Sequence, residues 1–251
     1  MKKLSRLSKY LIMTFAISWI SWGALILLIK SGVTTYANPL GLGVFLLGGF
    51  GPTVAAITVQ EKLTLKSLAE FVFGGNHREF LYFLLFCFLL IAVIGLSSRT
   101  LKPDMPLYLL PLNMLVMTTI GGGNEELGWR GVMQPTLEKS IPFPAAVALT
   151  SITWSIWHLP LWLVDGSSQQ AISFVEFAAF DIVLSSALAV IYGKTRCVFY
   201  CCLFHGLLNV LMAAFILSVN WIFVSGSLVI VMVSLLIWYF DLRKAAHKNL
   251  V

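Results

Sequence analysis

Residues 121–130 have the sequence GGGNEELGWR and directly follow an apolar stretch, residues 106–120. Two adjacent glutamates, Glu125 and Glu126, and a cation, Arg130, therefore continue a segment that is hydrophobic enough for the interior of a bilayer. Ionisable side chains at such a depth are costly, and they mark functional sites by default. This stretch therefore governs both the fold class and the search for a site.

Composition predicts a membrane protein. Hydrophobic residues make up 59% of the 251 residues and charged residues 11%, whereas soluble domains carry about 25% charged residues. We predict an all-α membrane protein of about eight transmembrane helices, each near the ~20 residues that cross a bilayer. They form a single domain, residues 1–251, whose motif-bearing core covers about 106–217. The predicted spans are about 10–29, 40–60, 80–97, 106–128, 143–164, 171–192, 197–217 and 220–240. A Gly51-Pro52 step is expected to break the second span.

Basic residues predict the orientation. Cytoplasmic loops are enriched in Lys and Arg, and eight spans with an inside N-terminus place 14 of the 17 Lys and Arg in the cytoplasm. The three outside are Lys30, Arg99 and Lys102. Both termini are therefore predicted to be cytoplasmic, and the net charge of +6 is interpreted as a topology signal with no nucleic-acid partner. The short, basic, Phe-rich chain favours a bacterial plasma membrane, with the first span retained as a signal-anchor.

The two glutamates are expected to differ in role. Glu126 lies four residues before Arg130, the favourable order for an ion pair within one helix. A buried charge without a partner is strongly destabilising, so Glu126 is expected to neutralise Arg130. Glu125 is rotated by about 100° on a helix of 3.6 residues per turn and has no local cation. It is the better candidate for a general base.

Two histidines lie inside predicted spans, and each has a partner one helical turn away. Trp154 precedes His158 by four residues, and Asn209 follows His205 by four. At 1.5 Å per residue, Glu125 and His205 lie about 12 Å, and His158 about 21 Å, from the cytoplasmic ends of their helices. A shared site of one carboxylate, two imidazoles and an amide is therefore expected.

Three motifs in this order resemble the CAAX prenyl endopeptidase and bacteriocin-processing family, CPBP or Abi. This family includes the type II CAAX prenyl endopeptidases of eukaryotes. Trp154 stands where phenylalanine is common and keeps the aromatic character. The motifs are Glu125-Glu126-x-x-x-Arg130, Trp154-x-x-x-His158 and His205-x-x-x-Asn209.

The resemblance implies an eight-helix intramembrane protease fold and an endopeptidase activity on peptide or membrane-anchored substrates, of CAAX or bacteriocin-leader type. It also implies roles for six residues. Water activation falls to Glu125 and His158, oxyanion stabilisation to His205 and Asn209, and support of the site to Glu126 and Arg130.

The residues leave the use of a metal open, and no cofactor is firmly implied. If a divalent metal such as zinc is bound, its ligands would be Glu125, His158 and His205, a three-ligand set with an open position. The metal-free glutamate mechanism is favoured, because no His-Glu-x-x-His helix occurs in the chain. Oligomeric state is not determined by the sequence.

Two other functions fit the same residues. A non-catalytic bacteriocin-immunity or scaffold protein would keep the fold without needing the candidate residues. A proton-coupled transporter would use a relay of Glu125, His158, Glu176 and Asp181, but no inverted repeat is evident. Helix-to-helix polar contacts are the favoured explanation for Glu176 and Asp181, and lining of the shared cavity is the alternative.

Overall fold

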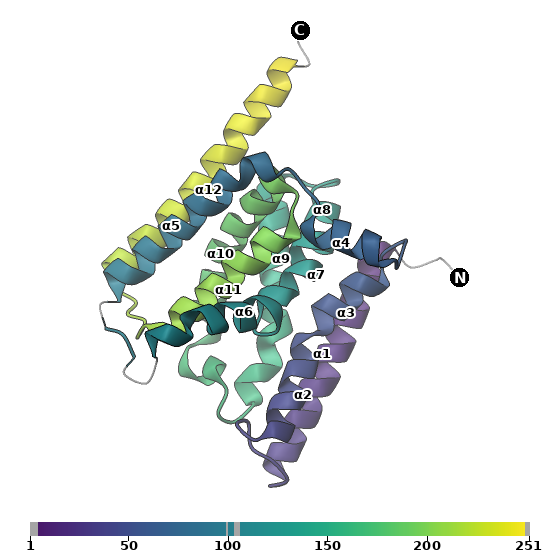
Figure 1. The fold of residues 1–251 in the computed structure, drawn as a ribbon, viewed down its shortest axis with the longest axis vertical. Coiled ribbons are helices and arrows are strands. Elements are labelled where there is room, and N and C mark those ends of the chain that lie inside the picture. The colour runs from purple at the N-terminus through teal and green to yellow at the C-terminus, as the bar shows by residue number, and fades with distance from the viewer. Residues whose placement is uncertain (1–4, 99, 103–105, 249–251) are drawn as a thin grey trace.

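The computed structural model of the chain is helical, as predicted (Figure 1). It describes residues 5–98, 100–102 and 106–248. Within these ranges the β-structure consists of one isolated bridge, which joins Leu101 to Phe215. The all-α fold class is therefore confirmed.

The helices follow one another with short connections. In chain order they are α1 (Arg6–Lys30), α2 (Pro39–Gly49), α3 (Gly51–Thr58), α4 (Leu65–Phe73), η1 (His77–Glu79), α5 (Phe80–Ser97), η2 (Leu107–Leu109), α6 (Leu110–Thr119), η3 (Gly123–Glu125), α7 (Glu126–Gly128), the π-helix η4 (Trp129–Met133), α8 (Gln134–Leu137), α9 (Phe143–His158), η5 (Leu159–Leu163), η6 (Ser168–Ala171), α10 (Phe174–Thr195), α11 (Val198–Ala214) and α12 (Trp221–Lys248).

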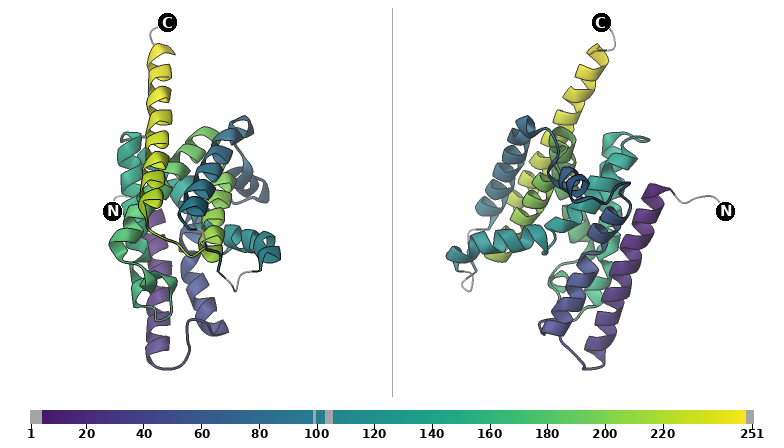
Figure 2. Two further views of the ribbon diagram at one scale, coloured as in Figure 1. Left: turned by 90° about the vertical axis from the view of Figure 1, so that its left-hand side faces the viewer. Right: turned by 45° about the vertical axis from the view of Figure 1, so that its right-hand side comes forward.

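The helices form two flanks around a central group. On one flank, α1 packs along the bent pair α2–α3, and on the other α12 lies beside α5 (Figure 1). Between the flanks, α10 contacts α9, α11 and α12, while α11 also packs on α6. The C-terminal half of α12 projects beyond the other helices (Figure 2). The short segments from η3 to η4 lie among α1, α3, α9 and α11, where the flank of α1 and α2–α3 meets the centre.

Large aromatic side chains fill the core at this meeting point. The side chains of Trp22, Trp129, Trp154 and Trp157 are all at most 2% exposed. Neighbouring rings lie close together, with centroids 4.7 Å apart for Trp22 and Trp157 and 5.8 Å for Trp129 and Trp157. Aromatic pairs at such distances add about 0.5–1.5 kcal/mol to the burial of their surface. They hold α1, η4 and α9 together.

Four helical segments among the described residues are long and apolar enough to cross a bilayer: Arg6–Lys30, Leu65–Ser97, Phe174–Thr195 and Trp221–Asp241. The pair α2–α3 makes a fifth if its 42° bend lies within one span, and this bend falls at the predicted Gly51-Pro52 break. The chain is therefore an integral membrane protein, but the count of eight spans is not confirmed. Three predicted spans contain helices of 10, 16 and 17 residues, namely α6, α9 and α11.

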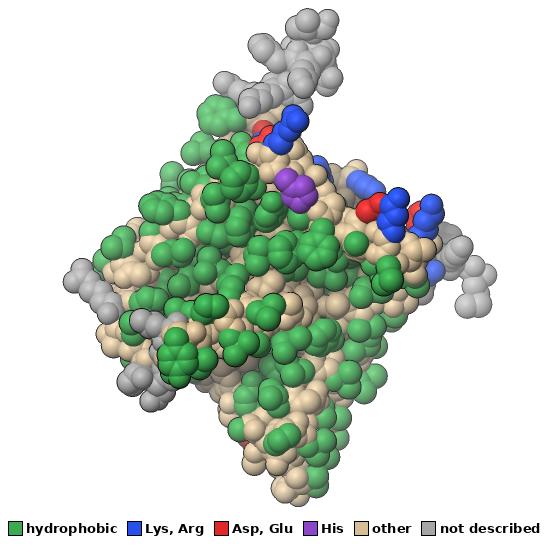
Figure 3. Space-filling view, in the orientation of Figure 1, with side chains coloured by type: hydrophobic (Ala, Val, Ile, Leu, Met, Phe, Trp, Pro, Cys, Tyr) green, Lys and Arg blue, Asp and Glu red, His purple; other side chains and the backbone are tan. Residues whose placement is uncertain are grey.

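The outer surface is apolar over most of the face in Figure 3, and the charged side chains on that face gather at its upper edge. Individual apolar residues on the flanking helices are largely open, as at Ile20, which is 73% exposed. A surface of this kind suits contact with lipid. The orientation of the two termini stays a prediction.

Close contact between α1 and the α2–α3 bend depends on glycine. A Cβ added at Gly51 would lie 2.1 Å from Ser18 Oγ and 2.8 Å from the Thr14 carbonyl oxygen, whereas one at Gly49 would meet nothing within 4 Å. We expect Gly51→Ala to lower the free energy of unfolding by about 1–3 kcal/mol through overpacking. Gly49→Ala is the matched control and should be neutral or stabilising. Unfolding in mixed detergent micelles measures both, and equal effects would contradict this packing argument.

Candidate functional site

A glycine turn places the acidic motif. Helix α6 ends at Thr119, and Gly122 then adopts a φ of 119°, a conformation that residues with a side chain rarely take. Asn124 fixes the turn, because its Oδ1 accepts from the Gly122 N–H at 3.3 Å and its Nδ2 donates to Thr53 Oγ1 at 3.0 Å. The chain then continues through η3 and α7, which carry the two glutamates inward.

Glu126 and Arg130 form the ion pair that the sequence predicted. Arg130 Nη1 lies 3.0 Å from Glu126 Oε2, and both side chains are fully buried. Arg130 Nη2 also donates to Ser185 Oγ at 2.8 Å, which ties the pair to α10. Arg130 lies in the π-helix η4, and such π segments are frequent at functional sites.

Glu126 has a second partner, which the sequence did not indicate. Its Oε1 accepts a hydrogen bond from His205 Nδ1 at 2.8 Å. One buried carboxylate therefore joins η4 to α11. It does more than neutralise Arg130, because it also sets the orientation and tautomer of a candidate site residue.

Glu125 lies on the other side of the turn and is 7% exposed. Its Oε2 accepts a hydrogen bond from the indole Nε1 of Trp154 at 2.8 Å. Within the described ranges no ion pair joins Glu125 to a cation. It is the glutamate without a charged partner, as the sequence predicted.

Both candidate histidines are held through the same ring nitrogen, Nδ1. His158 Nδ1 lies 3.0 Å from the carbonyl oxygen of Trp154, and His205 Nδ1 lies 2.8 Å from Glu126. Since a carbonyl and a carboxylate accept, each Nδ1 carries a hydrogen. In the neutral rings, each Nε2 therefore keeps its lone pair for other partners.

Asn209 lines the same space as His205. Its Nδ2 donates to the Gly121 carbonyl at 2.7 Å and so holds the glycine turn. A Cβ added at Gly122 would lie 2.6 Å from Asn209 Nδ2 and 3.1 Å from His205 Nε2. The missing side chain at Gly122 thus leaves a small cradle beside an amide and an imidazole, while the second N–H of the amide stays available for another acceptor.

The six candidate residues converge on Trp154 and the glycine turn. The ring centroid of Trp154 lies 5.2 Å from that of His205 and 5.8 Å from that of His158. Two other acidic residues have structural partners. Glu176 forms a capping box with Ser173 at the start of α10, and buried Asp181 accepts from Ser155 Oγ at 2.7 Å.

A metal centre is not formed by the candidate ligands. Among the described residues, no three His, Cys, Asp or Glu side chains come together as a metal site would require. The set Glu125, His158 and His205 therefore does not fit a zinc ion as arranged here, and we assign no step of a reaction to a metal.

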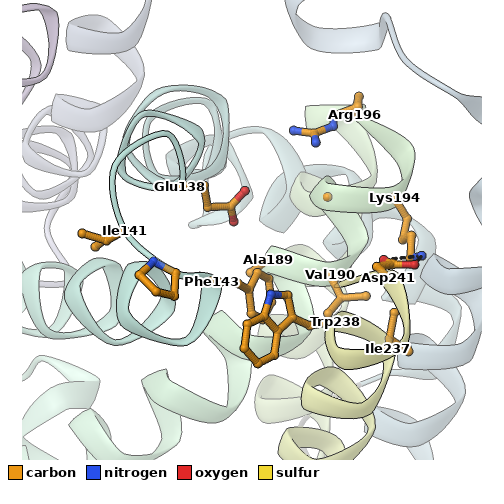
Figure 4. A pocket seen from close by; sticks show the side chains of 12 residues that line it. Glu138, Ile141, Phe143, Ala189, Val190, Lys194, Arg196, Ile237, Trp238 and Asp241 are labelled. Atoms are coloured by element: carbon orange, nitrogen blue, oxygen red, sulfur yellow. Dashed lines mark hydrogen bonds and ion pairs between the residues drawn. The ribbon is translucent and has the colours of Figure 1, made fainter. Parts of the chain in front are cut away.

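A cavity of about 670 Å³ lies apart from these residues, between α9, α10 and α12 (Figure 4). Its apolar wall includes Phe143 and Trp238, whose ring centroids lie 5.9 Å apart. Burial raises the pKa of the Glu138 carboxyl at its rim. The other charged lining residues are Lys194, Arg196 and Asp241. No candidate site residue lines this cavity, so it is a separate feature.

Comparison with known proteins bears on the segment that carries the three motifs. Residues 107–211 match the family described as type II CAAX prenyl endopeptidase Rce1-like. These residues are Rce1-like. The family that the motifs indicated is thereby confirmed for this segment, which includes every candidate site residue.

One curated relative extends this result. A stretch of 59 residues, 24% of this chain, is 37% identical to a protein named CAAX prenyl protease 2 from Methanococcus maripaludis. The match spans 22% of the length of that relative. That name describes the activity of the relative.

The sequence did not predict the hydrogen bond from the Trp154 N–H to Glu125 or the bond between Glu126 and His205. It also did not predict the roles of Gly122 and Ser185. The helical spacing of Trp154 and His158 was visible, but a ring on a shared face gives no indication of where its N–H points. The positive φ at Gly122 was signalled only by the glycine run. Contacts between helices distant in the chain, such as Arg130 with Ser185, leave no pattern in a single sequence.

Removing one partner of the buried Glu126–Arg130 pair should destabilise the protein far more than removing one partner of an exposed pair. Arg130→Met should lower the free energy of unfolding by about 3–5 kcal/mol, because it leaves the Glu126 carboxylate buried with one partner fewer. Lys66→Ala is the control, since Lys66 and Glu70 form an i,i+4 pair whose side chains are 88% and 66% exposed. Such exposed pairs contribute little. Unfolding in mixed micelles compares the two, and a similar small change in both would contradict the inferred importance of the buried pair.

Proposed function

We propose that the protein is an intramembrane endopeptidase that uses Glu125 as its general base. One observation carries this proposal. The buried carboxylate of Glu125 has no cationic partner among the described residues, and it occurs in the same cluster as His158 and His205, whose Nδ1 atoms are already bonded. Peptide hydrolysis needs a base for water, a partner for the developing oxyanion and a proton for the leaving amine. The cluster contains a candidate for each.

In the first step, Glu125 takes a proton from a water molecule. The hydroxide oxygen bonds to the carbonyl carbon of the substrate, and the carbonyl π electrons move to its oxygen. The Nε2 atom of neutral His158 accepts a hydrogen bond from the other O–H of the water. Nε2 is the acceptor because the Nδ1–H of His158 is bonded to the Trp154 carbonyl. This contact orients the water without a change in the charge of the ring.

His205 and Asn209 stabilise the negative charge that develops on the substrate oxygen. To donate at Nε2, His205 must carry hydrogens on both ring nitrogens, and the Glu126 carboxylate 2.8 Å from Nδ1 stabilises that cation. The free N–H of Asn209 is the second donor. When the carbonyl re-forms, the C–N bond breaks and the proton held by Glu125 passes to the amine.

The proposed substrate class is a membrane-anchored protein or a peptide that reaches the site through the bilayer. A prenylated C-terminal peptide is favoured over a bacteriocin leader, because the matched relative is named as a CAAX prenyl protease. Burial of the site among helices that could span a membrane supports a hydrophobic substrate.

The base is tested by Glu125→Gln, which keeps the size of the side chain and removes its basicity. We expect cleavage of a farnesylated CAAX reporter peptide in proteoliposomes to fall by at least about 100-fold, the lower range for a general base. Product termini are identified by mass spectrometry. Glu70→Gln, at an exposed position in α4, is the control and should cleave at the wild-type rate. Cleavage by folded Glu125→Gln protein at that rate would refute the proposed base.

The oxyanion cradle is tested by Gly122→Ala. A methyl group there would lie close to Asn209 and His205 and would strain the backbone at a φ of 119°. We expect kcat to fall at least about tenfold, since loss of an oxyanion donor costs about 100- to 1000-fold. Gly95→Ala, where a Cβ meets nothing within 4 Å, is the control. Equal kcat values for the two variants would place the oxyanion elsewhere.

A further inference from the structure

Trp154 makes polar as well as apolar contacts with the candidate site. Its indole N–H donates to Glu125, and its backbone carbonyl lies 3.0 Å from His158 Nδ1. Its ring meets His205 edge-on at 5.2 Å between centroids. The guanidinium carbon of Arg130 lies 5.0 Å from the ring centroid, within the range of a cation–π contact.

The hydrogen bond to Glu125 is short and protected. The donor and acceptor lie 2.8 Å apart, and Trp154 is only 2% exposed, so water has little access to compete for either atom. Hydrogen bonds to a carboxylate are shorter and stronger than those between neutral groups. An indole has one donor and no acceptor. It therefore fixes one carboxylate oxygen, Glu125 Oε2.

Contacts on the other sides of the ring prevent it from turning. Arg130 is itself held by Glu126 and Ser185, and the ring of His205 covers a further edge. The N–H therefore points in a fixed direction before substrate arrives. A base held within about 0.5 Å of its working position needs such support from surrounding side chains.

We propose that Trp154 is a positioning residue, whose indole N–H holds the Glu125 carboxylate in the orientation that abstracts a proton from water. This role rests on the proposed function of Glu125. Phenylalanine at the same position would preserve the aromatic packing but supply no hydrogen for the carboxylate. The chain thus couples its base to Arg130 and His205 through a single side chain.

The kinetic test is Trp154→Phe in the farnesylated-peptide assay. We expect kcat to fall about ten- to hundredfold, in line with the loss of a hydrogen bond to a charged group, while KM stays within about twofold because the ring still fills its place. Trp157→Phe is the matched control on the same helix. Trp157 is equally buried, and its Nε1 has no hydrogen-bond partner among the described residues. Its kcat should stay within about threefold of wild type.

A spectroscopic test does not depend on proteolysis. The chain has eight tryptophans, so ¹⁵N-labelled protein in micelles gives few indole N–H signals. The signal missing from Trp154→Phe identifies Trp154. That signal should shift clearly upfield in Glu125→Gln protein, because an amide oxygen is a weaker acceptor than a carboxylate. Glu138→Gln, at the separate cavity, should leave it in place.

The outcomes are distinct. An indole signal that Glu125→Gln does not move would overturn the hydrogen bond, and an unchanged kcat in Trp154→Phe would overturn the positioning role. If Trp154→Phe fails to fold, benzothienylalanine at position 154 keeps the bicyclic ring without the N–H and replaces it in both tests. If wild-type protein cleaves no peptide while Glu125→Gln does shift the indole signal, the proposed endopeptidase function is wrong and the hydrogen bond is confirmed.

Discussion

The Glu126 carboxylate is the group on which the rest of the site depends. It is fully buried and lies 3.0 Å from Arg130 and 2.8 Å from His205. A buried carboxylate is stable only if its oxygens are paired, so the positions of η4 and α11 are coupled to it. Arg130 extends the coupling to α10 through Ser185. Three segments that are distant in the sequence therefore meet at one charge.

This constraint explains why the neighbouring glutamate differs in chemistry. Arg130 and His205 both bond to Glu126. Glu125 faces the other side of the turn, where its carboxylate accepts the N–H of Trp154. A hydrogen-bond donor orients a carboxylate without cancelling its charge. The same turn thus supports one carboxylate for structure and one for reaction, and Gly122 allows both by turning the backbone through a positive φ.

The irregular helices have a common physical basis. The glycine run ends α6 early, the π-helix η4 rotates Arg130 toward its partners, and α9 changes at Leu159-Pro160 into a 3₁₀ turn directly after His158. In a bilayer, backbone that is not helical must be buried in protein or line a cavity. These breaks are enclosed by α1, α3, α10 and α11. The site lies where regular helices stop and polar groups must be satisfied locally.

The sequence by itself determined the helical membrane class, the family of the motif-bearing segment and the Glu126–Arg130 pair. Composition and spacing within one helix are local properties, and a single chain displays them directly. The count of eight spans stays a prediction, because α6, α9 and α11 are shorter than the helices that are long enough to cross a bilayer. Only the tertiary structure joined Glu126 to His205, Trp154 to Glu125 and Arg130 to Ser185. These bonds cross between segments 29 to 79 residues apart, and their directions depend on how the helices pack, which no spacing within one segment encodes.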